Sequence, residues 1–336
     1  MSNTNFFDGK SVLVTGGTGS FGKKFISTLL TEYDPEKVVI FSRDELKQHQ
    51  MRQDGRFRGE GRAEKLRFFV GNVRDKTRLE RAFDGIDIVV HAAALKQVPA
   101  CEYNPFEAVK TNVMGAKNII DAAIDRGVER IIALSTDKAC NPINLYGATK
   151  LCSDKLFVAG NSYVGEQDTR FSVVRYGNVV GSRGSVIPLF INQREEGGPL
   201  TVTDPKMTRF WITLEQGVHF VMDSLERMVG GELFVPKIPS MKITDLARAI
   251  APDADIETIG IRPGEKIHEV MISEDDARHT VEFDDYYIVQ PQFSWWNRDN
   301  GEIQAHSEPV PESFTYSSGD NDDWLTIEEL REIIAP

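Results

Sequence analysis

Short runs of β-branched and apolar residues alternate with amphipathic segments along the first half of the chain. The apolar runs occupy residues 11–15, 38–41, 66–70, 86–90, 130–135 and 171–175. Apolar residues spaced three and four apart, as on one face of a helix, mark residues 21–30, 77–83, 107–123 and 146–158. Strands alternating with helices form βαβ crossovers and a parallel sheet. The pattern therefore predicts an α/β fold with a Rossmann-type, doubly wound sheet of six strands.

Beyond residue 175 the alternation gives way to loops rich in Gly and Pro, with two helical stretches among them. These stretches lie at residues 214–228 and 244–250. Residues 290–323 are rich in Pro, Ser, Asn and Asp and contain Trp295 and Trp296, and we predict an extended arm over the surface.

The break in the pattern suggests two domains. Residues 1–178 are expected to form a cofactor-binding Rossmann domain to which residues 208–236 return. Residues 179–207 and 237–336 are expected to form a smaller C-terminal substrate-binding lobe with its arm. No internal repeat is visible.

Composition and charge limit the classes of partner. The chain has 336 residues, 40% hydrophobic and 27% charged, which is typical of a globular protein with a sizeable core. Its charge-free stretches are shorter than the ~20 residues that cross a bilayer, and its N-terminus does not resemble a signal peptide. Residues 273–336 carry 16 acids and 3 bases, whereas the first 272 carry 35 acids and 36 bases. Without an excess of Lys and Arg, nucleic acid is not an expected partner, and neither is a membrane.

The three cysteines, Cys101, Cys140 and Cys152, are odd in number and form no Cys-x-x-Cys pair. They indicate neither a disulfide framework nor a zinc site, and we expect no metal. A reducing cytoplasm is the expected location. Cys140 is interpreted as packing rather than as a reactive thiol.

A glycine-rich motif follows the first predicted strand directly. Gly16, Gly19 and Gly22 occupy the turn from this strand into an amphipathic helix. In this context the first glycine permits a tight turn, the second permits close approach of a pyrophosphate, and the third permits helix–strand packing. The helix N-terminus offers free N–H groups to the anion. The motif therefore predicts a dinucleotide site, the alternative being a simple glycine turn.

The end of the second predicted strand indicates which dinucleotide binds. An NAD site would place an acidic side chain here against the ribose 2′-hydroxyl, but the chain has Ser42 and Arg43, followed by Lys47. A guanidinium binds a 2′-phosphate bidentately, so we predict NADP. The alternative is a solvated loop in which Asp44 and Glu45 neutralise Arg43.

Candidate catalytic residues follow the fifth predicted strand. Tyr146 and Lys150 lie one turn apart on a helix, where the ammonium and a positive nicotinamide would favour the phenolate that removes a hydroxyl proton. Asp137 and Lys138 end the strand and form a candidate acid–base pair, whose protons we assign jointly. Desolvation by a bound sugar is expected to shift Lys138 towards the neutral amine. Outside this context, each pair would be an ordinary surface feature.

Together these motifs resemble the extended short-chain dehydrogenase/reductase superfamily, and a narrower resemblance rests on seven segments. These are residues 42–47, 91–96, 135–138, 141–150, 175–185, 207–212 and 262–266. Between about residues 10 and 275 the chain is similar to the inverting UDP-N-acetylglucosamine 4,6-dehydratases that open pseudaminic acid synthesis. In sugar dehydratases that retain configuration, an Asp-Glu pair stands where this chain has Asp137 and Lys138. The sequence departs from the family at Asn72, where Asp is usual, and in a long, Arg-rich segment at 51–65.

The resemblance implies oxidation of the sugar at C4, loss of water across C5 and C6, and return of the hydride to C6. The product would be UDP-2-acetamido-2,6-dideoxy-β-L-arabino-hexos-4-ulose. Catalysis is assigned to Thr136, Asp137, Lys138, Tyr146 and Lys150. Cofactor contacts are assigned to Gly16, Thr18, Gly19, Ser20, Phe21, Gly22, Ser42, Arg43, Lys47, Asn72, Val73, Ala92, Ala93, Lys96, Thr111, Tyr146 and Lys150. Substrate contacts are assigned to Lys96, Asn178, Ser182, Arg209, Arg262 and Glu265.

The resemblance also implies a homo-oligomer built on a dimer through the helices at 107–123 and 146–158, and similar dehydratases form hexamers. The residues leave three other functions possible for this chain. A retaining dehydratase is disfavoured by Lys138, and a UDP-sugar 4-epimerase needs no elimination pair. A non-catalytic NADP sensor would not need Tyr146 and Lys150.

Overall fold

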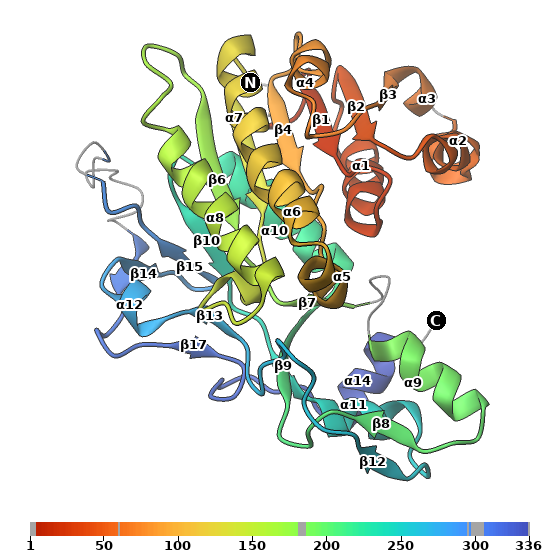
Figure 1. Ribbon diagram of the computed structural model, residues 1–336. Coiled ribbons are helices and arrows are strands. Elements are labelled where there is room, and N and C mark those ends of the chain that lie inside the picture. The colour runs from red at the N-terminus through yellow and green to blue at the C-terminus, as the bar shows by residue number, and fades with distance from the viewer. Residues whose placement is uncertain (1–4, 60, 181–185, 294–295, 297–305, 335–336) are drawn as a thin grey trace.

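A ten-stranded sheet forms the centre of the protein in the computed structural model, which describes residues 5–59, 61–180, 186–293, 296 and 306–334 (Figure 1). The strand order is β16-β14-β15-β10-β6-β5-β4-β1-β2-β3. Their bounds in this order are Glu308–Pro309, Thr280–Glu282, Tyr286–Val289, Leu233–Pro236, Arg170–Val174, Arg130–Leu134, Ile88–His91, Ser11–Thr15, Lys37–Ser42 and Leu66–Val70. The strands from β3 to β10 are parallel, and β15, β14 and β16 add antiparallel pairs.

The predicted α/β class and doubly wound sheet are confirmed, with all six predicted strands in the order 3-2-1-4-5-6. The sequence pattern did not predict the parallel strand β10 or the antiparallel edge beyond it. Each of these four strands has only two to four residues. Runs this short carry little periodicity, which explains why the pattern missed them.

Helices cover both faces of the sheet. On one face α4 (Lys76–Ala82), α7 (Met114–Arg126) and α8 (Leu145–Gly160) pack side by side (Figure 1). On the other, α1 (Ser20–Glu32) packs against α10 (Leu214–Arg227). Strand β1 is buried along its whole length, as expected for a strand covered on both sides. Shorter elements are α2 (Glu45–Gln53), η1 (Gly55–Phe57), α3 (Arg62–Lys65), α5 (Val98–Tyr103), η3 (Asp137–Ala139) and α12 (Glu274–Ala277).

The predicted helix at 107–123 is interrupted in the structure. It consists of α6 (Pro105–Ala108), a π-helical turn η2 (Val109–Val113) and α7. The side chain of Asn112 exchanges two hydrogen bonds of 2.9 Å with the backbone of Leu95 and donates to the Thr149 hydroxyl at 3.0 Å. These bonds tie the turn to α8 and to the loop after β4, so the irregular turn has tertiary partners.

A second hydrophobic core lies below the sheet in Figure 1, between α9 (Val186–Glu195), α11 (Ile243–Ile250) and α14 (Ile327–Ile334). Phe190, Leu246 and Leu330 are fully buried there. The paired strands β8 (Leu200–Val202) and β12 (Ile256–Thr258) border this core. A small sheet of β7 (Asn178–Val179), β9 (Thr208–Ile212) and β11 (Ser240–Lys242) lies between the two cores.

The described part of the predicted arm is more deeply integrated than expected. Strand β17 (Tyr316–Ser317) pairs with β13 (Val270–Ile272), and the buried Tyr316 hydroxyl bonds the backbone N–H and C=O of Ile238. The indole of Trp296 is also buried and donates to the Gly230 carbonyl at 2.8 Å, whereas Trp295 lies outside the described residues. The arm therefore contributes to the core instead of lying over the surface.

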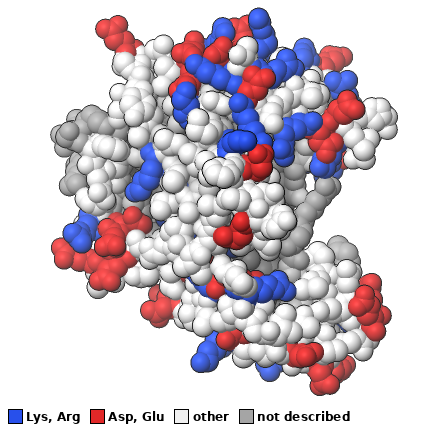
Figure 2. All heavy atoms as spheres, in the orientation of Figure 1, with Lys and Arg blue, Asp and Glu red and all other residues white. Residues whose placement is uncertain are grey.

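Charges of both signs are interspersed over α4 and α7 on the face shown in Figure 2. Lys76 pairs with Asp125 at 2.9 Å, and Lys117 pairs with Asp121 at 2.6 Å. Within the described residues, every helix is too short or too polar to span a membrane.

Candidate active site

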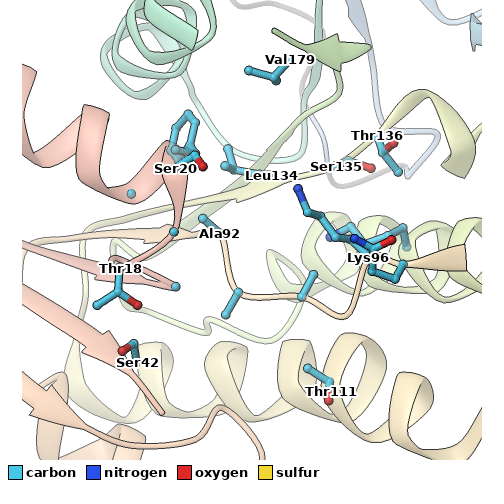
Figure 3. A pocket seen from close by; sticks show the side chains of 18 of the residues that line it. Thr18, Ser20, Ser42, Ala92, Lys96, Thr111, Leu134, Ser135, Thr136 and Val179 are labelled. Atoms are coloured by element: carbon cyan, nitrogen blue, oxygen red, sulfur yellow. The ribbon is translucent and has the colours of Figure 1, made fainter. Parts of the chain in front are cut away.

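A cavity of about 930 Å³ opens at the carboxyl ends of the parallel strands, where the chain reverses direction between β1 and β4 (Figure 3). Open α/β sheets bind ligands at such a switch point. Twenty predicted site residues line it. They are Gly16, Thr18, Gly19, Ser20, Phe21, Gly22, Ser42, Arg43, Lys47, Asn72, Val73, Ala92, Ala93, Lys96, Thr111, Thr136, Lys138, Tyr146, Lys150 and Asn178.

The glycine loop has the geometry of an anion cradle. Gly16 has φ +67°, and a Cβ there would lie 3.0 Å from the Ala92 carbonyl. A Cβ on Gly22 would lie 2.5 Å from the Cα of Gly17, so only glycine allows α1 to pack this closely. Gly19 is the N-cap of α1 and gives no side-chain cap, which leaves the first N–H groups of the helix available to a ligand.

Arg43 is exposed at the edge of the cavity, directly after β2. Its neighbour Asp44 caps α2 and pairs with Lys47 at 2.6 Å. Within the described residues, Arg43 forms no ion pair, so the predicted alternative in which Asp44 neutralises it is not observed. Lys47, predicted to assist with a phosphate, lines the cavity and pairs there with Asp44.

Asn72 lies in the turn after β3 and lines the cavity. Its side-chain oxygen accepts the Arg74 N–H at 3.1 Å, a local turn contact. Asn72 is one of the predicted cofactor contacts, and its side-chain oxygen already has a protein partner in this structure.

Tyr146 and Lys150 lie on the first turns of α8 and are both buried. Burial raises the pKa of Tyr146 to about 12, against the opposing effects of the Lys138 charge and a hydrogen bond with Thr136. Burial also lowers the pKa of Lys150, which Asp154 opposes. The resting pair is therefore a phenol beside a destabilised ammonium, an arrangement that favours proton transfer once a further positive charge is bound.

Asp137 and Lys138 lie in the turn η3, directly after β5. Lys138 Nζ lies 3.0 Å from Asp137 Oδ1, to which the Thr136 hydroxyl donates at 2.8 Å. Lys138 lines the cavity, whereas Asp137 lies buried behind it. Burial alone lowers the pKa of Lys138, but the charges of Asp137 and Glu269 outweigh it and raise that pKa. Lys138 is therefore an ammonium in this structure, whereas the neutral amine is predicted for the state with a sugar bound and stays a prediction.

The turn at Asp137–Ala139 and helix α8 are held in close contact by a glycine. A Cβ on Gly147 would lie 2.9 Å from the Lys138 carbonyl carbon and closer still to its oxygen. The side chain of Asn144 caps α8 by accepting the Gly147 N–H at 2.8 Å. The glycine thus fixes the separation of Lys138 from Tyr146.

The expected substrate residues are dispersed. Lys96 and Asn178 line the cavity, and Ser182 lies outside the described residues. Arg262 is exposed and pairs with Glu265 at 3.7 Å, away from the cavity wall. Arg209 is mostly buried and donates to the Ile267 carbonyl at 3.0 Å.

Three site residues were missed by sequence reasoning. Trp211 and Tyr176 line the cavity, and Glu269 lies 3.3 Å from Lys138 Nζ. Glu269 comes three residues after the Arg262-to-Lys266 motif, so proximity in sequence was the only available signal. His91 is buried and bonded to the Thr15 hydroxyl at 2.8 Å, which agrees with a strand-end role rather than that of a base.

A Rossmann-type sheet with a Tyr-x-x-x-Lys helix beside its fifth strand defines a short-chain dehydrogenase/reductase. Residues 12–291 match the family model described as "Polysaccharide biosynthesis protein". A UDP-N-acetylglucosamine 4,6-dehydratase (inverting) of Campylobacter jejuni is 54% identical over 98% of each chain. A UDP-glucose 4-epimerase of Rickettsia canadensis is 43% identical, over 84% of this chain and 83% of its own. The X-ray structure of Pen from Bacillus thuringiensis has a TM-score of 0.86 at 37% identity, covering 98% of both chains.

The chain therefore belongs to the polysaccharide biosynthesis protein family, and its resemblance to inverting UDP-N-acetylglucosamine 4,6-dehydratases is confirmed. A nucleotide-sugar 4,6-dehydratase is the activity that this relationship supports.

Proposed function

We propose that the protein is a UDP-N-acetylglucosamine 4,6-dehydratase that inverts C5 and uses NADP. The observation that carries the proposal is the placement of two proton-transfer pairs around one cavity. Tyr146 and Lys150 come from α8, Lys138 comes from the turn after β5 with Asp137 behind it, and Gly147 sets the distance between them. A cavity of about 930 Å³ is at the large end of the range for ligand pockets.

The glycine cradle fits the pyrophosphate of a dinucleotide, and exposed Arg43 fits a 2′-phosphate. The Arg43 guanidinium at the end of β2 has no ion-pair partner in the part of the chain that the structure describes, and this favours NADP over NAD, because a 2′-hydroxyl would leave that charge without a partner. When bound there, the nicotinamide would supply the hydride chemistry that links C4 to C6. All other steps rely on side chains of this chain.

Oxidation at C4 requires removal of the hydroxyl proton. Tyr146 accepts this proton in the proposal, and the positive charge of Lys150 favours the phenolate. Thr136 hydrogen-bonds Tyr146 and donates to Asp137 at 2.8 Å. This hydroxyl connects the oxidation pair to the elimination pair, so a proton gained by Tyr146 has a route to Asp137.

Elimination then uses the acidity that a C4 ketone gives to the C5 proton. The Asp137–Lys138 pair takes the C5 proton and supplies a proton to the C6 hydroxyl, which leaves as water. After hydride addition at C6, the pair returns a proton to C5. Over one cycle, the Asp137–Lys138 pair thus gains one proton and loses two. The missing proton is the one that Tyr146 took from the C4 hydroxyl.

The nucleotide sugar is proposed to bind where the two cores meet. Residues 1–178 and 208–236 would hold the cofactor, and residues 179–207 and 237–336 would hold the UDP-sugar. Lys96 and Asn178 are in place at the cavity wall. Arg209, Arg262 and Glu265 would need to move towards the cavity to reach a diphosphate, and Ser182 is assigned from the family resemblance alone.

We also propose a homo-oligomer through α7 and α8. Three large hydrophobic side chains on or beside these helices are exposed: Tyr103, Phe106 and Met114. Exposed apolar residues of this size are typical of contact surfaces.

The second candidate is a UDP-sugar 4-epimerase, the name carried by the 43% identical relative. An epimerase needs Tyr146 and Lys150 but no acid–base pair at C5. The buried ion pair of Asp137 and Lys138 at the cavity favours the dehydratase.

The test is to incubate the purified protein with UDP-N-acetylglucosamine in deuterated water without added reductant and to follow the sugar by proton NMR. A 6-deoxy-4-keto product with deuterium at an inverted C5 is expected. Retained configuration would refute the role of Lys138, a C4 epimer would identify the second candidate, and no turnover would refute both.

A further inference from the structure

Glu269 is a buried carboxylate beside the elimination pair to which no role has been assigned. It directly precedes β13, and only 2% of the residue is exposed. Its Oε1 lies 3.3 Å from Lys138 Nζ and 4.0 Å from Arg209 Nε. A carboxylate this deep is retained only when its charge is compensated, and Lys138 is its nearest cation.

Two carboxylates therefore hold Lys138 from behind. The ammonium donates to Asp137 Oδ1 at 3.0 Å and lies close to Glu269 Oε1, while its side chain lines the cavity. An ammonium has three N–H groups. One of them is donated to Asp137 and Glu269 lies beside the ammonium as an ion-pair partner, which leaves N–H groups for a ligand in the cavity.

In each of the two carboxylates, the oxygen that does not contact Lys138 is buried. Asp137 Oδ2 and Glu269 Oε2 have no hydrogen-bond partner among the described residues. For each carboxylate, the nearest charged group is therefore the Lys138 ammonium, and the contact is made through one oxygen only. Loss of the Lys138 proton would leave two buried anions with Arg209 as the nearby cation, 4.0 Å from Glu269, a costly arrangement.

The backbone around Glu269 is held by the C-terminal arm. Ser318 Oγ accepts the Glu269 N–H at 2.9 Å, and the Ser318 N–H donates to the Glu269 carbonyl at 2.8 Å. Ser318 is fully buried and also bonds the Thr208 hydroxyl at 2.8 Å. The side chain of Glu269 is therefore presented to Lys138 by a fixed backbone.

We propose that Glu269 is a positioning residue that, together with Asp137, holds Lys138 as an ammonium with one N–H directed at the sugar. This inference rests on the proposed dehydratase function and deepens it. It makes Lys138 the acid of the pair, a role that the sequence left open. Arg209 and Tyr146 are the other ionisable groups facing Lys138, and both are kept in the test.

The test is the pH dependence of dehydration by the full-length Glu269→Gln variant, which keeps the shape and removes the charge. Lys138 must be protonated to act as an acid, so activity falls as pH rises through its pKa. An opposite charge at this distance shifts a pKa by roughly 1–3 units. The alkaline loss of kcat should therefore begin roughly 1–3 pH units lower in Glu269→Gln than in the wild type, with KM little changed because Glu269 does not line the cavity.

Glu232→Gln is the matched control, because Glu232 is also fully buried but bonds Ser172 and the backbone at residues 229 and 230. Its pH profile should match the wild type. If Glu269→Gln does not fold, Glu269→Asp carries the test, and a smaller shift in the same direction is expected.

A uniform drop in kcat at all pH values, or an unshifted alkaline limb, would overturn the inference and leave the dehydratase intact. Failure of the wild type to dehydrate UDP-N-acetylglucosamine would instead refute the proposed function, and the inference with it.

Discussion

Replacement of Gly147 by alanine tests whether close packing of α8 on the turn at Asp137–Ala139 is needed for catalysis. The new Cβ would lie 2.9 Å from the Lys138 carbonyl carbon and 3.1 Å from Pro142 Cβ. The first of these neighbours is backbone, which cannot rotate aside. The turn and the helix must therefore separate, by roughly 1 Å, which moves Lys138 relative to Tyr146.

The expected cost has two parts. Overpacking of this kind destabilises a protein by about 1–3 kcal/mol, measured here by urea unfolding. A displacement of about 1 Å at reacting groups lowers kcat roughly 100-fold. The activity loss should therefore exceed what the unfolded fraction explains, with cofactor affinity nearly unchanged.

Gly217→Ala, within helix α10, is the control, because the nearest neighbour of its new Cβ would be a side-chain atom of Ile212 at 3.9 Å. It should be neutral or stabilising by up to about 1 kcal/mol. Wild-type kcat and stability in Gly147→Ala would refute the reasoning.

Three further predictions concern the cofactor, the acid and a buried imidazole. Arg43→Ala should weaken NADP binding about 10- to 100-fold in a fluorescence titration and leave NAD nearly unchanged; equal losses would contradict the 2′-phosphate contact. Lys138→Ala should keep the fold and bind NADP but lose exchange of C5 with deuterated water, and full exchange would remove Lys138 from its role. Burial lowers the pKa of His91 to about 3, so the unfolded chain binds a proton that the folded one excludes below pH ~6.5. His91 should therefore contribute a loss of stability of about 1.4 kcal/mol per pH unit from ~6.5 towards 3, and His91→Gln should reduce the wild-type slope by that amount; an identical slope in the variant would argue against it.

Much of the fold was predictable because its signals are local. The first six strands are continuous apolar runs, and the turn after β1 needs glycine at Gly16 and Gly22 for steric reasons. The candidate catalytic pairs could likewise be proposed from the sequence because Asp137 and Lys138 are adjacent and Tyr146 and Lys150 are four residues apart. Spacing of this kind can be read directly from the sequence.

What the sequence could not provide are relationships between distant segments. Glu269 lies more than a hundred residues from Lys138 in the chain, and its backbone is held by Ser318 of the arm. The π-helical turn at 109–113 likewise depends on Asn112 meeting Leu95 and Thr149. Neither contact leaves a periodic pattern, and the first one places beside Lys138 a second carboxylate that the sequence did not predict.

The central claim is that hydride removed from C4 returns to C6 of the same sugar. The most direct measurement uses UDP-N-acetylglucosamine labelled with deuterium at C4 and with carbon-13 in the sugar ring, mixed with unlabelled substrate and followed by NMR and mass spectrometry of the product. We expect a 4-keto product carrying the deuterium at C6 only in the carbon-13-labelled molecules, with loss of one water. Deuterium returned to C4 without loss of water would show an epimerase and contradict this claim.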